Sequence, residues 1–390
     1  MNMNINKERL KETFIKLVRI DSPSKEEREL SDFLKDLFRN ELGCKVFEDD
    51  SMDKTGSNCG NLKVEVPGDS DASSLFFNAH LDTVEPGRGI KPIFRDGKFF
   101  TDGSTILGAD DKAALAILIE VARVFAENQI PHPPLEFLFT VCEEIGLLGA
   151  KALDPTFLKA KRGYALDTTE IDILINQAPC ATKFKVKILG KAAHSGLHPE
   201  AGISAIKLAS KAISELNLGR IDEETTANIG IIRGGIATNI VPDETIVEGE
   251  VRSHKKEKLT RLQDAILGAF HKAVMDFREE AGDVLTTAKG VPSIQSEVIN
   301  DYPMISIAET HPLIEIAVRA GRSADMDMKI RPMGGGSDAN IFNGKGLETV
   351  IMGVGMQKVH STEEFILLED MVKSARLVIE IIKEWEKGNF

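Results

Sequence analysis

The fold is decided by one stretch of the sequence, Leu135-Glu136-Phe137-Leu138-Phe139-Thr140-Val141-Cys142-Glu143-Glu144. Its first part is a short apolar run, which is typical of a strand buried in a sheet, and two acidic residues follow at once. Paired carboxylates at the end of a buried strand cost free energy unless something positive holds them. Adjacent side chains diverge, so one carboxylate can bind a metal while the other acts as a general base. The alternative is a solvated helix start.

Further strands and helices alternate on both sides of this stretch. An apolar run at 75–79 ends at His80, and a strongly apolar helix is expected at 110–127. We also expect helices over 7–40 (broken at 21–27), 312–323 and 367–387, and strands at 44–47, 61–66 and 347–353. Within the break, Ser24 and Glu27 have capping-box spacing. This alternation predicts an α/β fold with a mainly parallel sheet covered by helices.

The pattern changes near residue 178. Residues 181–188 alternate polar and apolar side chains, as a half-exposed strand does. The following elements are a helix at 203–216, strands at 226–233 and 244–252, a helix at 255–280 and a strand at 291–299. This β-α-β-β-α-β order predicts a small sheet with helices on one face, in a second domain inserted at 180–300. The first domain is then discontinuous, comprising 1–179 and 301–390.

The composition excludes several kinds of partner. The 390 residues include 48 basic and 61 acidic ones, for a formal net charge of −13. An acidic surface argues against nucleic acid and anionic membrane as main partners. The sequence has no apolar run of about 18 residues, which a membrane-spanning helix needs. The four cysteines form no CxxC pair, so we expect a cytoplasmic protein.

Other strand ends and loops carry residues of metal-binding type. They include His80 with Asp82 two positions later, Asp110-Asp111 after Gly108-Ala109, Asp167 after an apolar run, and His360. Asp82 is placed to hold the imidazole of His80 in one tautomer. Asp110-Asp111 can offer a carboxylate that bridges two metals, or can be a helix N-cap pair. Together these segments suit Zn²⁺, Co²⁺ or Mn²⁺ and indicate metal-assisted hydrolysis.

In their order along the chain, these segments resemble the dinuclear metallopeptidases that include peptidase T, carboxypeptidase G-type enzymes, aminoacylases and acetylornithine deacetylase. The resemblance covers nearly the whole chain. It implies two divalent metal ions per chain, zinc first, with cobalt or manganese as alternatives. It further implies that His80 and Asp167 bind one metal, that Glu144 and His360 bind the other, and that Asp110 bridges them.

The same resemblance assigns the catalytic groups. Glu143 becomes the general base and Asp82 the residue that steers it, with a cis peptide bond between Asp110 and Asp111. The segment 190–196, Gly-Lys-Ala-Ala-His-Ser-Gly, resembles the family's lid motif. The resemblance thus makes 180–300 a lid and dimerisation domain, and 1–179 with 301–390 the catalytic, metal-binding domain. In that motif the histidine, here His194, reaches the partner subunit's active site and stabilises the oxyanion, which implies a homodimer.

Three substrate contacts are also implied. Arg252 and Asn239 resemble positions that grip the carboxylate or carbonyl groups of the substrate, and Gly336 and Ser337 lie in a segment that resembles the substrate loop. The alternatives are a cross-strand ion pair for Arg252 and, for the glycine-rich loop, a nest of backbone amides with no ligand. His198 is the rival of His194.

The predicted function is therefore peptidase T-like hydrolysis of small peptides, of the tripeptide aminopeptidase type. A water activated by two metals attacks the peptide carbonyl, and Glu143 moves the proton. The segment Gly108-Ala109-Asp110-Asp111-Lys112-Ala113 looks like the bridging segment of peptidase T. The alternatives are an N-acyl amino acid deacylase or carboxypeptidase of the same family, and a non-catalytic scaffold.

Overall fold

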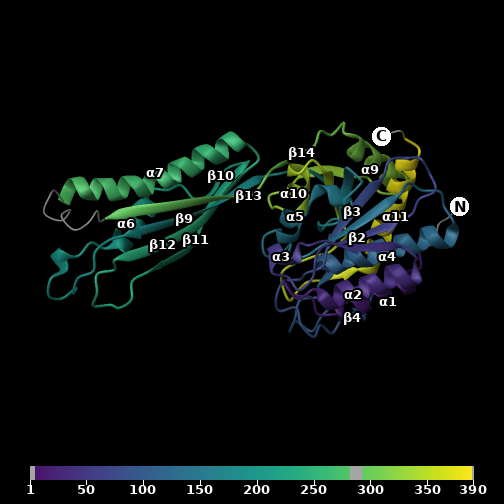
Figure 1. Cartoon of the computed structure of the whole chain (residues 1–390), viewed down its shortest axis with the longest axis horizontal. Coiled ribbons are helices and arrows are strands. Elements are labelled where there is room, and N and C mark those ends of the chain that lie inside the picture. The colour runs from purple at the N-terminus through teal and green to yellow at the C-terminus, as the bar shows by residue number, and fades with distance from the viewer. Residues whose placement is uncertain (1–4, 282–291, 389–390) are drawn as a thin grey trace. The chain divides into compact units, whose positions relative to one another are not determined.

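The computed structural model describes residues 5–281 and 292–388 (Figure 1). The chain forms two compact units, of which the first comprises Met1–Ala178 and Ile305–Phe390 and the second comprises Pro179–Met304. Each unit has its own hydrophobic core. Among the described residues, no helix is both long enough and apolar enough to cross a membrane.

The first unit is built on a nine-stranded sheet. Its central strands are parallel to one another: β6 (Leu135–Thr140), β3 (Leu75–His80), β7 (Arg162–Ala165) and β16 (Glu348–Met352). The outer strands are β1 (Lys45–Glu48), β2 (Leu62–Val66), β8 (Ile173–Ala178), β14 (Ile305–Ser306) and β15 (Lys329–Pro332). The pairings of these outer strands are antiparallel except for that between β8 and β15, which is parallel. The prediction of a mainly parallel sheet is confirmed, and its four parallel strands end at one edge.

Helices cover both faces of this sheet. They are α1 (Lys7–Val18), α2 (Arg28–Asp36), α3 (Met52–Thr55), α4 (Ala109–Asn128), α5 (Leu148–Ala152), α9 (Pro312–Ser323), α10 (Asp338–Gly344) and α11 (Leu368–Glu386), with short turns η1 (Leu37–Glu41) and η2 (Pro155–Phe157). Phe76 and Phe77 of β3 are both fully buried, although successive strand residues point to opposite faces. Phe76 packs edge-on against Phe342 of α10. Phe77 stacks on Tyr164, whose hydroxyl donates a hydrogen bond to the carbonyl of Leu313 in α9 at 2.6 Å.

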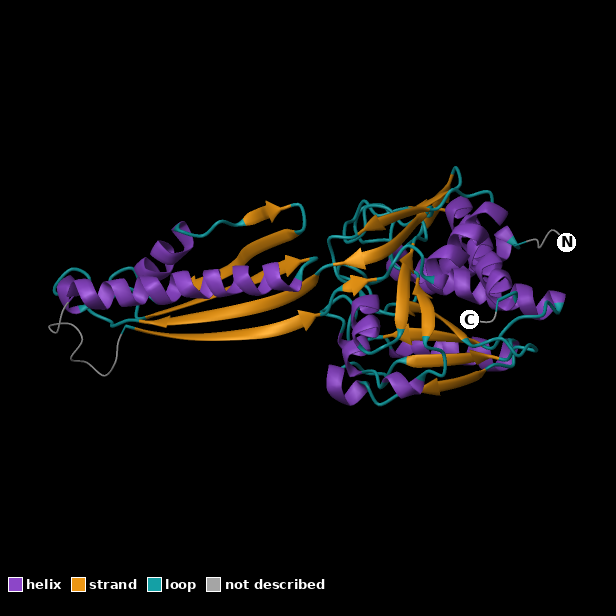
Figure 2. Cartoon of the chain, turned by 90° about the horizontal axis from the view of Figure 1, so that it is seen from above, coloured by secondary structure: helices purple, strands orange, loops and turns teal. Residues whose placement is uncertain are grey.

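The second unit is an antiparallel sheet with helices on one face (Figure 2). Its elements are β9 (Cys180–Leu189), η3 (Pro199–Ala201), α6 (Ala205–Ser214), β10 (Gly219–Asp222), β11 (Thr225–Gly234), β12 (Glu244–Ser253), α7 (Lys256–Ala281) and β13 (Ser293–Tyr302). The strand order is β10-β11-β12-β9-β13. The strand predicted at 291–299 corresponds to β13, and residue 291 lies outside the described residues.

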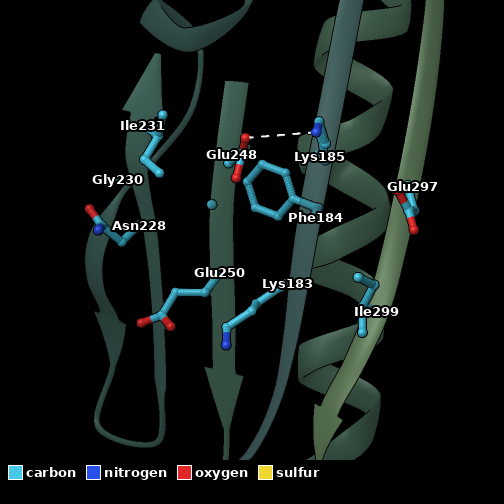
Figure 3. A pocket seen from close by; sticks show the side chains of 11 residues that line it. Lys183, Phe184, Lys185, Asn228, Gly230, Ile231, Glu248, Glu250, Glu297 and Ile299 are labelled. Atoms are coloured by element: carbon cyan, nitrogen blue, oxygen red, sulfur yellow. Dashed lines mark ion pairs between the residues drawn. The ribbon is translucent and has the colours of Figure 1, made fainter. Parts of the chain in front are cut away.

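Strand β9 shows why the helices cover only one face. Phe184, Val186 and Ile188 are buried in the core under the helices, while Lys183 and Lys185, which alternate with them, point the other way. That open face carries a groove of ≈ 490 Å³ lined by charged side chains from three strands (Figure 3). The alternating pattern in the sequence therefore reports this one-sided burial directly.

Two features escape the sequence pattern. Strand β10 precedes β11, and a separate three-stranded sheet joins β4 (Ile93–Arg95), β5 (Lys98–Phe100) and β17 (Ile366–Leu367). Strands of two to four residues are too short to show a period of two. The inserted unit thus has one strand more than the predicted β-α-β-β-α-β order.

Candidate metal centre

Each of the four parallel strands is followed by a predicted site residue. These are His80 at the end of β3, Glu143 and Glu144 after β6, Asp167 after β7 and His360 in the loop after β16. The carboxyl ends of neighbouring parallel strands lie at the same edge of a sheet, where α/β proteins place their ligands. The fold itself therefore brings together segments that are distant in the sequence.

Asp110 lies between two histidines. Its Oδ1 is 3.0 Å from Nε2 of His80, and its Oδ2 is 3.2 Å from Nε2 of His360. Nε2 of His360 is also 3.0 Å from Oε2 of Glu144. Ligand atoms of His80, Asp110 and Glu144 all lie within 4.8 Å of one another, close enough to share a metal ion. A carboxylate that faces an imidazole on each side has the arrangement of a bridging ligand.

The ring of His80 is oriented for coordination. Its Nδ1 lies 2.9 Å from the backbone carbonyl oxygen of Asp82, which can only accept a hydrogen bond. Nδ1 therefore carries a proton, so Nε2, which lies 3.0 Å from Oδ1 of Asp110, is the ring nitrogen placed to bind a metal. The carboxylate Oδ1 of Asp82 is farther from Nδ1, at 3.5 Å. The backbone of Asp82, more than its side chain, thus holds the tautomer.

The start of α4 separates the roles of its two aspartates. The peptide bond between Asp110 and Asp111 is cis, as predicted. Both aspartates have non-helical backbone angles, with φ −81° and ψ 101° for Asp110 and φ −120° and ψ 26° for Asp111. The regular helix therefore begins after them, and the N-cap alternative for the pair stays a prediction. While Asp110 faces the histidines, Oδ2 of Asp111 accepts a hydrogen bond from the backbone N–H of His80 at 3.1 Å. Asp111 therefore stabilises the backbone at the end of β3.

The charges of this cluster of side chains fit a cation. Burial raises the pKa of the carboxyl groups of Glu143, Glu144 and Asp167, each of which has acidic neighbours. Hydrogen bonds to Asp110 and then to Glu144 raise the pKa of His360 to about 10. Oε1 of Glu144 is buried and has no hydrogen-bond partner. Imidazole nitrogens and carboxylate oxygens with unbalanced negative charge are the donor set of a divalent metal.

The carboxylate of Asp82 is fully buried and supports the segment that carries the two glutamates. Its Oδ1 accepts the backbone N–H of Glu143 at 2.9 Å, and its Oδ2 accepts that of Glu144 at 3.2 Å. Oδ2 also accepts the hydroxyl of Ser24 at 2.6 Å. Charge-assisted hydrogen bonds of this kind fix the backbone from which both side chains project.

The capping-box hypothesis for Ser24 and Glu27 is wrong. Helix α2 begins after Glu27, which makes no side-chain cap. The carboxylate of Glu27 is instead buried, where it accepts the hydroxyl of Ser57 at 2.7 Å and the backbone N–H of Cys142 at 3.0 Å. Burial raises its pKa. Both residues thus brace the strand end after β6, which local spacing could not reveal.

Two further buried acids were missed by the sequence analysis. Glu364 is 1% exposed and contacts the turn before α4, and Asp338 is 2% exposed at the first position of α10. Neither oxygen of Asp338 has a hydrogen-bond partner, and burial raises its pKa to about 7. Burial also raises the pKa of Glu364 to about 7, although three backbone amides oppose the shift. Asp338 interacts electrostatically with His80.

The residues predicted to contact the substrate are divided between the two units. Ser337 caps α10, its hydroxyl accepting the N–H of Ala339, and it follows the partly buried Gly336. In the second unit, Arg252 pairs with Glu250 of its own strand at 2.9 Å.

His194 is exposed and lies beside Asn239. The backbone N–H of Ser195 donates to the carbonyl of Asn239 at 2.9 Å, and His194 forms a bridge with Ile240. His198, the rival of His194, is also exposed and lies 3.4 Å from Glu200. His194 and Asn239, the two residues predicted to act on the substrate from this part of the second unit, are therefore both exposed to solvent.

Comparisons with known proteins agree with this geometry. The profile of the peptidase dimerisation domain matches residues 180–276, and that of peptidase family M28 matches residues 61–196. The uncharacterized protein YqjE of Bacillus subtilis is 43% identical over 98% of this chain and all of its own length. Peptidase T of a Geobacillus strain is 26% identical over 89% of this chain and 82% of its own.

Two solved structures match over the full fold. A crystal structure of the aminopeptidase PepT from Bacillus cereus has a TM-score of 0.88 and 42% identity, covering 98% of this chain and 100% of the other. A tripeptidase from Staphylococcus aureus has a TM-score of 0.91 and 38% identity with the same coverage.

The fold, the converging donors and these relatives define a metal-dependent hydrolase of peptide bonds. The chain belongs to the M20/M28 family of dinuclear metallopeptidases. Within that family it is similar along its whole length to structures described as PepT and as a tripeptidase.

Proposed function

We propose that this protein is a peptidase T-like enzyme that releases the amino-terminal residue from small peptides, tripeptides in particular. The observation that carries the proposal is the placement of Asp110 between His80 and His360, with Glu144 at hydrogen-bond distance from the second histidine. The names of the PepT and tripeptidase relatives, at 42% and 38% identity, support the choice of substrate.

The metal pair would be held by five side chains. We assign His80 and Asp167 to one ion, Glu144 and His360 to the other, and Asp110 to both. Two imidazoles and three carboxylates favour Zn²⁺, with Co²⁺ or Mn²⁺ as substitutes. Such a pair, when bound, supplies Lewis-acid activation of water and of the peptide carbonyl.

Glu143 moves the protons in this proposal. It takes a proton from the attacking water and then delivers it to the nitrogen of the leaving amine. Its buried position raises the pKa of its carboxyl group, which brings that pKa towards the range in which a group both accepts and returns a proton. Asp82 aligns this base by holding the backbone N–H of Glu143 at 2.9 Å.

We assign the second unit to a lid that also forms a homodimer. Both of its connections to the first unit lie at the end of the sheet where Ala181 pairs with Tyr302. The loop that carries His194 lies beyond Leu189, at the other end of β9. Because β9 has ten residues at roughly 3.3 Å each, these ends are about 30 Å apart.

We assign His194 to the active site of a partner subunit, as in the lid motif that residues 190–196 resemble. There its imidazole would donate a hydrogen bond to the oxyanion that develops on the peptide carbonyl. Asn239, whose backbone is bonded to the same loop, would contact the substrate from beside it. Arg252 would bind a substrate carboxylate by exchanging it for Glu250, and Gly336 and Ser337 would line the substrate path in the first unit.

A substrate panel tests the proposal against its alternatives. The purified protein, loaded with Zn²⁺, Co²⁺ or Mn²⁺, is incubated with tripeptides, dipeptides, amino-terminally blocked tripeptides and N-acetyl amino acids. We expect turnover of free tripeptides and none of the blocked ones. Turnover of N-acyl amino acids alone would identify a deacylase, and cleavage of blocked peptides at the carboxyl end would identify a carboxypeptidase. Failure to retain metal with no turnover at all would support a scaffold.

A further inference from the structure

One buried carboxylate joins two loops that carry metal ligands. Oε2 of Glu364 accepts hydrogen bonds from the backbone N–H groups of Leu107 at 2.8 Å and Gly108 at 2.7 Å. Its Oε1 accepts the backbone N–H of Asp110 at 3.0 Å. Both oxygens are thus used, and the side chain is 1% exposed.

The two loops are distant in the sequence. Glu364 lies four positions after His360, in a loop closed by the pairing of Gln357 with Phe365. Its hydrogen-bond partners lie 254 to 257 positions earlier, in the turn that presents Asp110. One side chain therefore sets the separation between the segment that carries His360 and the segment that carries Asp110.

The turn before α4 needs an external acceptor. Asp110 and Asp111 have non-helical backbone angles, so the N–H groups of Leu107, Gly108 and Asp110 lie ahead of the regular helix and outside its hydrogen-bond ladder. Buried N–H groups need a partner from elsewhere in the fold. The φ of Gly108 is 72°, which favours glycine at this position. A carboxylate from another loop satisfies these three donors.

We propose that Glu364 is a positioning residue of the dinuclear centre, which holds Asp110 and His360 at the spacing that binding of both metals requires. It touches neither substrate nor metal and acts through the backbone of Asp110. The inference rests on the proposed function only for its kinetic measurement, since metal binding and backbone protection are measured without substrate.

The test compares Glu364→Gln with Glu363→Gln in the full-length protein. Glu363 is the adjacent residue of the same loop, but its side chain is 73% exposed and pairs with Lys358 at 2.7 Å. Zn²⁺ is titrated into metal-stripped protein, and amide hydrogen exchange is followed at Leu107, Gly108 and Asp110. We expect Glu364→Gln to bind Zn²⁺ about 10–100-fold more weakly, as loss of a group that supports a ligand commonly does. The three amides should exchange faster, and Glu363→Gln should match the wild type in both measurements.

A kinetic measurement separates positioning from general loosening of the fold. At saturating Zn²⁺, Glu364→Gln should regain most of the wild-type kcat, because metal binding restores the ligand spacing. Glu364→Asp serves if the glutamine variant does not fold, since it keeps the charge but is too short to reach all three amides. We expect the Zn²⁺ affinity of Glu364→Asp to lie between that of the wild type and that of Glu364→Gln. Wild-type affinity and unchanged amide exchange in a folded Glu364 variant would overturn the proposal. A wild type that binds two Zn²⁺ but cleaves no peptide would overturn the proposed function alone.

Discussion

The carboxylate of Asp82 holds the backbone N–H of Glu143 at 2.9 Å. Sequence spacing alone pairs Asp82 with the imidazole of His80, but its carboxylate oxygen lies 3.5 Å from that ring. The side chain thus fixes the strand end after β6, while its backbone carbonyl fixes the imidazole. Asp82 thus contacts the segment of Glu143 through its side chain and the ring of His80 through its backbone carbonyl.

Replacement of Asp82 by asparagine should impair the general base. Asparagine offers one acceptor oxygen where the carboxylate offers two, so one of the N–H groups of Glu143 and Glu144 loses its partner. We expect kcat to fall about 10–100-fold with a smaller change in KM. Steady-state kinetics on a tripeptide measures this, with the exposed Asp71→Asn as control. Unchanged kcat in a folded, metal-loaded Asp82→Asn enzyme would contradict the role.

The adjacent glutamates should separate into a base and a ligand. Glu143→Ala should retain two metals and lose about 10²–10⁴-fold in kcat, the range attributed to general acid–base catalysis. Glu144→Ala should lose one metal, because its Oε2 faces Nε2 of His360 at 3.0 Å. Metal content by mass spectrometry, measured beside kcat, distinguishes them. Equal loss of metal from both variants would show that the base is assigned to the wrong residue.

Metal should stabilise the protein more as pH rises. Burial raises the pKa of Asp338 from 3.8 and of Glu364 from 4.5 to about 7, and hydrogen bonds to Asp110 and Glu144 raise that of His360 from 6.5 to about 10. All three groups bind protons more tightly when folded. Their contribution to metal-free stability is therefore complete below the unfolded pKa values and is lost as pH rises through the folded ones.

Metal binding has the opposite dependence, since its ligands must be deprotonated. The difference in Tm between metal-loaded and metal-stripped protein should thus grow from about pH 5 to about pH 8. Differential scanning calorimetry of both forms at each pH measures it, and groups far from the site cancel in the difference. A difference that shrinks over this range would refute the assignment of these buried groups to a cation site.

Mixed dimers should reveal a shared active site. Subunits that carry Glu143→Ala are combined with subunits that carry His194→Ala, each inactive as a homodimer. If His194 acts across the interface, one of the two active sites in a hybrid has both groups, and partial activity returns. Mixing Glu143→Ala with His198→Ala, next to the same loop, tests the rival histidine. Verified subunit exchange without recovery in the first mixture would count against action of His194 in the partner.

Sequence patterns predicted candidate site residues most directly where a strongly apolar strand ends. His80 and Glu143 stand directly after buried strands, where the chain changes abruptly from apolar to charged. The long helices α4 and α11 were predicted to within one or two residues, since both are continuous and apolar on the buried side. Local composition was sufficient wherever apolar and charged residues adjoin in the sequence.

The supporting groups could not be found in this way. Glu364 stands in Ser361-Thr362-Glu363-Glu364, which has the composition of a surface loop, and its partners are more than 250 positions away. Glu27 likewise contacts Cys142 across 115 positions. Such groups are defined by tertiary contacts, and a single sequence carries no local signal for them.

The strand pairing at the base of the inserted unit has an engineering consequence. Ala178 at the end of β8 is directly paired with Ile305 at the start of β14, antiparallel. Paired residues of this kind have Cα atoms about 4.5–5.5 Å apart, a gap that a two-residue turn closes. We therefore expect the inserted unit to be removable as one module. Excising it and splicing in a tight turn would complete a hairpin and leave the register of the nine-stranded sheet unchanged.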